Sequence, residues 1–279
     1  MIDTRYPLII SDFDGTLVRR DGIVSEENKN AIARHQQNGG FFVISTGRMP
    51  LGIFPRVKEL GLQGAVSACN GSVILDIESG KLLREGKIPH ETTLQVVKKM
   101  EEMSLHIHLY ELWDYYCNMD DEALKTYENI VGIKAKLVLD RPLFELVREG
   151  KISAYKILVM VPEEDCERVL NELKQENFQG CEVLRSSRFL VEVVSKTYSK
   201  GTTVEFLAEY YGVPIEKTVA IGDQLNDIPM IERAGLGVAV QNADDRVKAV
   251  ADFVTQETNE TNAVAEIIQK FGLYEEKKV

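Results

Sequence analysis

The sequence lacks the features that mark several special classes of protein. Residues 1–5 show no basic segment followed by an apolar one, as a signal peptide would. A membrane-spanning helix needs about 20 apolar residues, and no apolar run in the sequence approaches that length. Negative charge exceeds positive charge, with a formal net charge of −11, whereas nucleic-acid binders usually carry a basic face. We therefore expect a cytoplasmic protein with no nucleic-acid partner, no membrane partner and no obligate protein partner.

Cysteine is also scarce. The four cysteines are widely spaced and form no C-x-x-C pair: Cys69, Cys117, Cys166 and Cys181. This spacing argues against a zinc site or a disulfide framework, and it predicts free thiols in a reducing compartment.

What is present is the composition and rhythm of a globular α/β protein. Hydrophobic residues make up 44% of the 279-residue chain, enough for a substantial core. Short apolar runs at 7–10, 41–44 and 65–68 predict buried strands, and the segments that begin near Ser25 and Pro50 predict helices. Strands that alternate with helices in this way are typical of a parallel sheet.

The alternation stops in the middle of the chain and resumes near its end. Between residues 86 and 187 the pattern mixes helices with strands such as 105–110 and 154–161. From about residue 201, helices and strands alternate again, and a last helix begins at about Asn262. We predict a Rossmann-like parallel-sheet core made of residues 1–85 and 188–279, with an inserted α+β domain at 86–187.

Polar residues follow the predicted core strands, where ligands bind in parallel α/β sheets. They are Asp12 and Asp14 after the first strand, Thr46 after the second, Asn70 after the third, and Asp223, Asn226 and Asp227 after the fourth, with Lys200 just before the helix that leads to the fourth. Carboxylates gathered at one edge repel one another, and bound Mg²⁺ relieves the repulsion because it prefers oxygen ligands. The pattern therefore predicts a Mg²⁺ site at which an aspartate can attack phosphorus and a second carboxylate can serve as acid and then base.

Four segments together resemble the motifs of the haloacid dehalogenase (HAD) superfamily. They are Asp12-Phe13-Asp14-Gly15-Thr16-Leu17, Ser45-Thr46-Gly47-Arg48, Ser199-Lys200-Gly201 and Gly222-Asp223-Gln224-Leu225-Asn226-Asp227. The insertion between the second and third segments resembles the C2-type cap of the Cof (C2B, IIB) subfamily. The resemblance implies a Mg²⁺-dependent phosphatase that acts through an aspartyl-phosphate intermediate on small phosphorylated metabolites, such as sugar phosphates, nucleotides or cofactor phosphates.

The resemblance also implies a role for each matching residue. Asp12 is the expected nucleophile, and Asp14 is the expected general acid and base. The expected phosphate ligands within the motifs are Thr46, Gly47, Arg48, Lys200 and Asn226, and Asn70 joins them from its place after the third predicted strand. The expected metal ligands are Asp12, Asp14 through its backbone carbonyl, Asp223 and Asp227. Two positions depart from the family pattern, with Met49 where proline is common and Thr261-Asn262 where Asp-Gly is common.

Several assignments stay open at this level. Arg48 fits a substrate-phosphate contact and a structural ion pair equally well. His106 and His108 alternate along one predicted strand, and without a nearby Cys or a third His we expect a solvent-exposed face rather than metal ligands. The aromatic segment at 109–116 fits a substrate-cavity lining or packing and subunit contacts, and packing is favoured.

Two other functions fit the same motifs. A phosphotransferase or phosphosugar mutase would pass the phosphoryl group to a sugar hydroxyl in place of water. A non-catalytic, ligand-binding regulator would be expected to lack the nucleophile or the acid. Both Asp12 and Asp14 are present, so a phosphatase is the favoured hypothesis.

Overall fold

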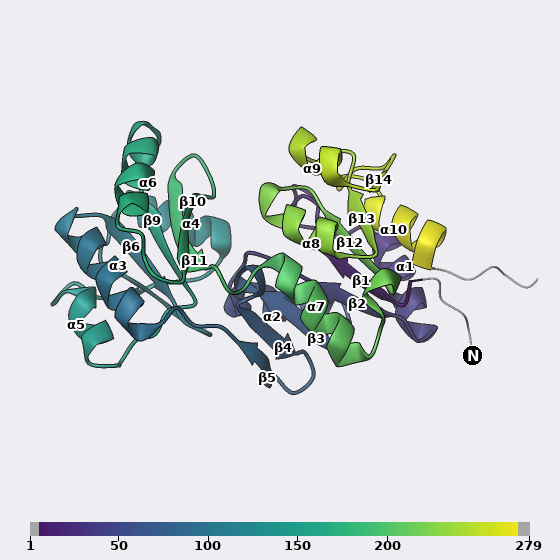
Figure 1. Cartoon of the computed structure of the whole chain (residues 1–279), viewed down its shortest axis with the longest axis horizontal. Helices are drawn as coiled ribbons and strands as arrows, with labels where there is room; N and C mark the ends of the chain where they lie inside the picture. The colour runs from purple at the N-terminus through teal and green to yellow at the C-terminus, as the bar shows by residue number, and fades with distance from the viewer. Residues whose placement is uncertain (1–5, 273–279) are drawn as a thin grey trace, which may run out of the picture. The chain divides into compact units, whose positions relative to one another are not determined.

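A computed structural model describes residues 6–272 of the chain (Figure 1). The chain divides into two compact units, each with its own sheet. The first comprises the residues up to Arg48, Ile53–Arg84 and the residues from Tyr198 onward, and the second comprises Met49–Gly52 and Glu85–Thr197. The expectation about residues 1–5 lies outside the described part. Within that part, none of the helices combines the length and the apolar character that crossing a membrane requires.

A five-stranded parallel sheet forms the centre of the first unit, in the strand order β14-β13-β12-β1-β2. Its strands are β1 (Leu8–Ser11), β2 (Phe41–Ile44), β12 (Thr218–Gly222), β13 (Leu236–Ala239) and β14 (Phe253–Val254). All four residues of the central strand β1 are buried, as expected for a parallel strand that is covered on both faces. The predicted Rossmann-like parallel core is confirmed.

Within residues 6–272, six α-helices belong mainly to the first unit. They are α1 (Glu26–Gln37), α2 (Pro50–Glu59), α7 (Lys200–Tyr211), α8 (Ile228–Arg233), α9 (Asp245–Val250) and α10 (Ala263–Ile267). Ser25 caps α1 as predicted, since its hydroxyl accepts a hydrogen bond from the backbone N–H of Asn28 at 3.1 Å. Ser199 caps α7 in the same way within a capping box that includes Thr202. This second cap makes Lys200 the first residue of its helix.

The third predicted strand corrects our expectation about the sheet. Strand β3 (Ala65–Ala68) pairs antiparallel with β4 (Val73–Asp76) in a separate three-stranded sheet that ends with β5 (Leu82–Glu85). One isolated parallel bridge, between Ser45 and Ser67, links it to the end of β2. The chain reverses immediately after β3, so β4 is the strand that pairs with it along its length.

The second unit is built on a six-stranded sheet in the order β10-β11-β9-β6-β7-β8. Its strands are β6 (His106–Tyr110), β7 (Tyr115–Cys117), β8 (Lys136–Leu137), β9 (Lys156–Met160), β10 (Cys181–Arg185) and β11 (Leu190–Ser195). Its helices are α3 (His90–Glu102), α4 (Glu122–Val131), α5 (Leu143–Arg148) and α6 (Cys166–Gln175). Strand β11 pairs with β10 and β9, so the unit continues to Thr197, beyond the boundary that we placed at residue 187.

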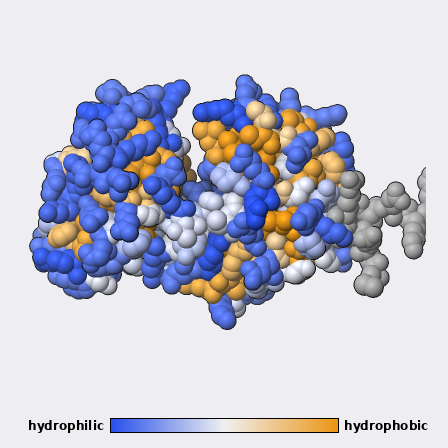
Figure 2. Space-filling model, in the orientation of Figure 1, coloured by the Kyte–Doolittle hydropathy of each residue, from blue (hydrophilic) through white to orange (hydrophobic). Residues whose placement is uncertain are grey.

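The two faces of this second sheet differ in chemistry. Apolar side chains at alternate positions, such as Ile107, Leu109 and Ile157, share one core with helices α3, α5 and α6. Hydrophilic residues dominate the visible outer surface of the unit (Figure 2). The other set of alternate positions on β6 carries His106 and His108, which are also buried, with 6% and 0% exposure.

The prediction of a solvent-exposed histidine face is therefore wrong. The alternation along β6 was correctly identified, but α4 contributes Tyr127, whose ring lies 5.0 Å from that of His108. Tyr110 and Tyr115 stack with their ring centroids 5.2 Å apart on the same side, so the packing expected of the aromatic segment is confirmed for these two residues. The tyrosine rings and α4 cover the histidine side of β6. The two-residue alternation in the sequence does not reveal this cover.

Candidate active site

Three of the predicted carboxylates, Asp12, Asp223 and Asp227, come together at the carboxyl edge of the parallel sheet in the first unit. Strands β1 and β12 are neighbours, and the backbone N–H of Asp12 donates to the carbonyl of Ile221 at 2.8 Å. This parallel register places Asp12 beside the end of β12, which Asp223 follows. Asp12 and Asp223 are buried, with 5% and 2% exposure, so their charges lie largely out of water.

Lys200 joins two of the buried carboxylates. Its ammonium nitrogen Nζ donates to Oδ1 of Asp12 at 2.6 Å and to Oδ1 of Asp227 at 2.5 Å. Burial alone would lower the pKa of Lys200, but the charges of Asp12 and Asp227 raise it above its ordinary value, so the lysine stays protonated. Burial raises the pKa of Asp12 well above its usual range, and Lys200 is the main influence that opposes this rise. The ionised form of Asp12 therefore depends on Lys200.

Asp227 is held in place by the turn that contains it. Its second oxygen, Oδ2, accepts hydrogen bonds from the backbone N–H groups of Asp223 and Gln224, both at 2.9 Å. Gly222 lies directly beneath, because a Cβ atom at this position would come within 2.4 Å of Asp227. Both carboxylate oxygens of Asp227 are thus engaged, one with Lys200 and the other with the backbone of the turn.

Asp223 is oriented by residues whose roles we did not predict. The hydroxyl of Thr16 donates to its Oδ1 at 2.6 Å, and the side-chain amide of Gln224 donates to its Oδ2 at 3.0 Å. Burial raises the pKa of Asp223, and these two hydrogen bonds act in the opposite direction. Gly15 has φ of +80°, and a Cβ there would lie 2.5 Å from Oδ2 of Asp223. The signal available in the sequence was that Thr16 lies two positions after Asp14 and that Gln224 directly follows Asp223.

Asp14 is not part of this buried group. Its side chain is 50% exposed, and its two oxygens accept hydrogen bonds from Nε and Nη2 of Arg48 at 2.7 and 2.6 Å. The hydrogen bond to Asp14 is the main reason that the pKa of Arg48 is raised. The guanidinium also lies 5.1 Å from the ring centre of Phe13. Of the two interpretations left open for Arg48, the structure contains the ion pair.

The remaining predicted phosphate ligands surround the end of β2. Thr46 is buried, and its carbonyl accepts a hydrogen bond from the backbone N–H of Asn70 at 2.9 Å. The side-chain amide of Asn226 donates to Oδ1 of Asn70 at 3.0 Å. Gly47 faces the same amide, since a Cβ there would lie 3.1 Å from that oxygen. Thr46, Gly47, Asn70 and Asn226 therefore form a connected polar rim.

The carboxylates fit a hard divalent cation. Asp12, Asp223 and Asp227 each offer one oxygen, and these oxygens lie within 4.8 Å of one another. Asp12 and Asp227 both contact the ammonium group of Lys200, whose one positive charge only partly balances the three carboxylates of this group. A donor set made of oxygen atoms alone, with excess negative charge, suits Mg²⁺. The side chain of Asp14 lies outside this group.

Comparisons with known proteins extend over almost the whole chain. A sequence model of the haloacid dehalogenase-like hydrolase family matches residues 9–268. The chain is 30% identical to a putative phosphatase of Haemophilus influenzae over 266 residues, which cover 95% of this chain and 98% of the relative. It is 31% identical to the Bacillus subtilis protein named 5-amino-6-(5-phospho-D-ribitylamino)uracil phosphatase YcsE over 274 residues, which cover 97% and 98%. A solved structure from Thermotoga maritima matches with a TM-score of 0.86 and 26% identity, covering 96% of this chain and 98% of that one.

Proposed function

The chain belongs to the haloacid dehalogenase-like hydrolase family and is a phosphatase of that family, and from this premise we propose that it hydrolyses phosphate monoesters of small metabolites with Asp12 as the nucleophile. The observation that carries the proposal is the buried contact of 2.6 Å between Asp12 and Lys200 at the carboxyl edge of the parallel sheet. Burial favours protonation of Asp12 and Lys200 opposes it, and the ionised carboxylate is the form that attacks phosphorus.

In the first step, a carboxylate oxygen of Asp12 attacks phosphorus in line with the departing alcohol oxygen. The bond between phosphorus and that oxygen breaks as the new bond to Asp12 forms. Asp14 donates a proton to the departing oxygen, which leaves as an alcohol. Lys200 and the hydroxyl of Thr46 hold the phosphoryl oxygens in place.

In the second step, water attacks the phosphorus of the aspartyl phosphate. Asp14, now ionised, takes a proton from that water. The bond between phosphorus and the Asp12 oxygen breaks, which releases inorganic phosphate and restores the carboxylate. Asp14 thereby regains in the second step the proton that it gives in the first.

Other residues act by positioning these groups. Asp227 fixes Lys200 through the contact at 2.5 Å, and Arg48 fixes Asp14 through two hydrogen bonds. Asp12, Asp223 and the backbone carbonyl of Asp14 would hold Mg²⁺, which when bound neutralises charge on the transferring phosphoryl group.

We assign the second unit to substrate selection, as the cap domain of the enzyme. A small phosphorylated metabolite is the proposed substrate class, and the name of the Bacillus relative, which specifies a phosphorylated ribitylaminouracil, supports it. A reducing cytoplasmic setting is proposed as well, because the four cysteines are buried and widely spaced in the sequence, with no C-x-x-C pair among them.

A phosphate-release screen over a panel of phosphorylated metabolites tests the proposal. The full chain is assayed with Mg²⁺ and with a chelator, beside the variants Asp12→Asn and Asp21→Asn. Asp21 is an exposed aspartate paired with Arg19 outside the site, so its variant is the matched control. We expect Mg²⁺-dependent release from the wild type and the control, and none from Asp12→Asn. Release by Asp12→Asn at the wild-type rate would overturn the nucleophile assignment, and formation of a phosphosugar when sugar acceptors are added would indicate a transferase.

A further inference from the structure

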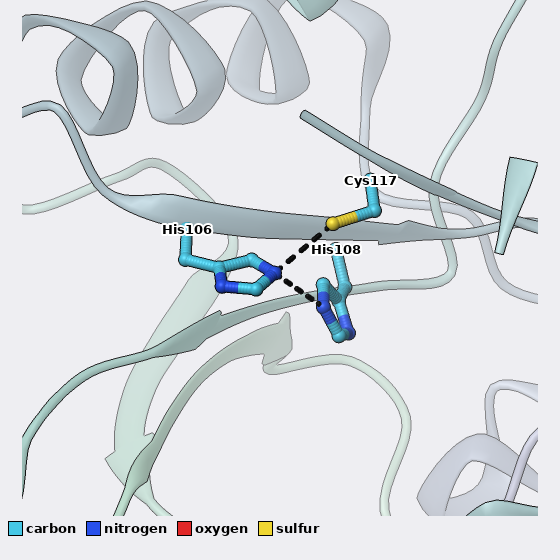
Figure 3. Close-up of side chains that lie close together, drawn as sticks. All are labelled: His106, His108 and Cys117. Carbon is cyan, nitrogen blue, oxygen red and sulfur yellow. Dashed lines mark hydrogen bonds between the residues drawn. The ribbon is translucent and has the colours of Figure 1, made fainter. Parts of the chain in front are cut away.

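A second group of ligand-type side chains lies within the second unit, independent of the phosphatase site. His106 and His108 extend from β6 and Cys117 extends from the neighbouring strand β7, and the three side chains converge (Figure 3). Their exposed fractions are 6%, 0% and 0%. We propose that His106, His108 and Cys117 bind a thiophilic transition-metal ion of the Zn²⁺ type, with water as a fourth ligand.

The separations between the candidate ligand atoms suit a tetrahedral ion. Nε2 of His106 lies 3.1 Å from Sγ of Cys117 and 3.2 Å from Nε2 of His108. The three ligand atoms all lie within 4.8 Å of one another. A tetrahedral Zn²⁺ with bonds of about 2.0–2.1 Å to nitrogen and about 2.3 Å to sulfur places its ligand atoms about 3.3–3.6 Å apart. The two short separations therefore need to widen by only a few tenths of an ångström.

Each histidine has a partner on the ring nitrogen that faces away from the cluster. Oδ2 of Asp121 lies 3.2 Å from Nδ1 of His106, and the hydroxyl of Tyr110 lies 3.4 Å from Nδ1 of His108. Histidines that bind metals usually donate their second ring N–H to a carboxylate or a similar acceptor, which turns the other nitrogen toward the ion. Asp121 occupies this position for His106, because it lies at Nδ1 while Nε2 points toward the other two side chains.

Asp121 also connects the cluster to solvent and to a helix. Its side chain is 45% exposed, so the buried cluster is one side chain away from the surface. Its other oxygen, Oδ1, caps α4 by accepting a hydrogen bond from the backbone N–H of Leu124 at 2.8 Å. A bound ion would therefore tie β6, β7 and the start of α4 together.

The protonation states favour neutral imidazole ligands and require one proton to leave. Burial lowers the pKa of His106 and lowers that of His108 to about 3, so both rings keep a free lone pair at neutral pH. Burial raises the pKa of the Cys117 thiol to about 12, so metal binding must displace its proton.

The same contacts can also be satisfied by hydrogen bonds alone. His108 Nε2–H can donate to Nε2 of His106, Tyr110 can donate to Nδ1 of His108, and Cys117 can donate to the carbonyl of Met119 at 3.2 Å. On metal binding, the His108 proton moves to Nδ1 and Tyr110 turns its hydroxyl proton to Tyr127, whose oxygen lies 2.5 Å away. One proton, that of Cys117, is released for each ion bound.

Cobalt provides a direct spectroscopic test with the full chain. Chelator-treated protein is titrated with Co²⁺, and the thiolate-to-cobalt charge-transfer band in the near ultraviolet is recorded together with proton release. Zn²⁺ affinity is then measured in competition with a chromophoric chelator. The variants are Cys117→Ser and His108→Gln, and the matched controls are Cys181→Ser, a buried cysteine of the same unit, and His90→Gln, an exposed histidine.

We expect the thiolate band to saturate at one thiolate-bound Co²⁺ per chain, with one proton released at this site, in the wild type and both controls, and the band to be lost in Cys117→Ser and His108→Gln. Asp121→Asn, a partly exposed position that tests the idea without disturbing the core, should bind Zn²⁺ about 10–100-fold more weakly. The Asp12 site has oxygen donors, so it cannot give the thiolate band. The proposal is overturned if wild-type protein shows no such band, or if its Zn²⁺ affinity equals those of Cys117→Ser and Asp121→Asn.

Discussion

Replacing Lys200 by methionine isolates the part of the site on which the nucleophile depends. The substitution keeps most of the length of the side chain but removes its charge and both contacts, at 2.6 Å to Asp12 and 2.5 Å to Asp227. Lys200 is 1% exposed, so water does not take its place. Removing one partner of a buried ion pair costs about 3–5 kcal/mol, and we expect a loss of that size in the free energy of unfolding at pH 7.

This loss should depend on pH in a defined direction. Burial already raises the pKa of Asp12, and without Lys200 its main opposing influence is gone. A carboxyl group whose pKa is higher in the folded than in the unfolded protein contributes stability below its unfolded pKa of about 3.9, and that contribution is lost as the pH rises. The difference between Lys200→Met and the wild type should therefore be smaller at pH 5 than at pH 7.

Urea unfolding followed by far-ultraviolet circular dichroism measures the effect at both pH values. Trp113, the single tryptophan, lies in the second unit, so its fluorescence follows that unit separately. Lys29→Met is the control, since it breaks an exposed pair with Glu26 and should cost less than about 0.5 kcal/mol. The reasoning is refuted if Lys200→Met unfolds at the same urea concentration as Lys29→Met at pH 7, or if its deficit grows at pH 5.

Three further predictions follow from particular contacts. Gly15→Ala should lose about 1–2 kcal/mol of stability and most of its Mg²⁺-dependent activity, because φ is +80° and the new Cβ would lie 2.5 Å from Asp223. The control is Gly39→Ala, where φ is +85° and a Cβ would have no neighbour within 4 Å. In parallel unfolding and phosphate-release assays, this control should show the stability loss alone. Asp14→Asn should lower kcat by about 10²–10⁴-fold through the lost acid and base, and an unchanged kcat contradicts that role. Burial holds the pKa of His108 at about 3, so as the pH falls the unfolded state binds a proton at this residue before the folded state does. The free energy of unfolding of chelator-treated protein should therefore fall by about 2 kcal/mol between pH 7 and pH 5 because of this residue, and that of His108→Gln should fall correspondingly less. Equal losses in the two proteins would contradict the burial.

The core strands and the residues that follow them were predictable because each depends on a local pattern. The buried run that leads to Asp12 and the cap at Ser25 that starts α1 both leave direct signatures in the sequence. The start of α7 was placed one residue too late, because Lys200 is its first residue. The parallel sheet then brings the strand ends to one edge. The position of β3 was not predictable in the same way, because a short apolar run does not reveal which partner it pairs with.

Features that depend on distant residues could not be read from the pattern. The engagement of both oxygens of Asp227 depends on the backbone path of the turn from Asp223, which no residue type specifies. The burial of His106 depends on α4 and on the pairing of β6 with β7, which brings Cys117 to within 3.1 Å across eleven positions of sequence. Such burial is a property of the tertiary packing and leaves no period in the strand itself.

Trapping the phosphorylated enzyme tests the central claim about Asp12 most directly. The full chain is mixed with a phosphate-labelled substrate and Mg²⁺, quenched in acid within the first turnover and mapped by mass spectrometry. We predict a hydroxylamine-sensitive phosphoryl group on the peptide that contains Asp12, accumulating in Asp14→Asn and absent from Asp12→Asn. Turnover without any phosphorylated protein, or a phosphoryl group on another residue, would contradict the account.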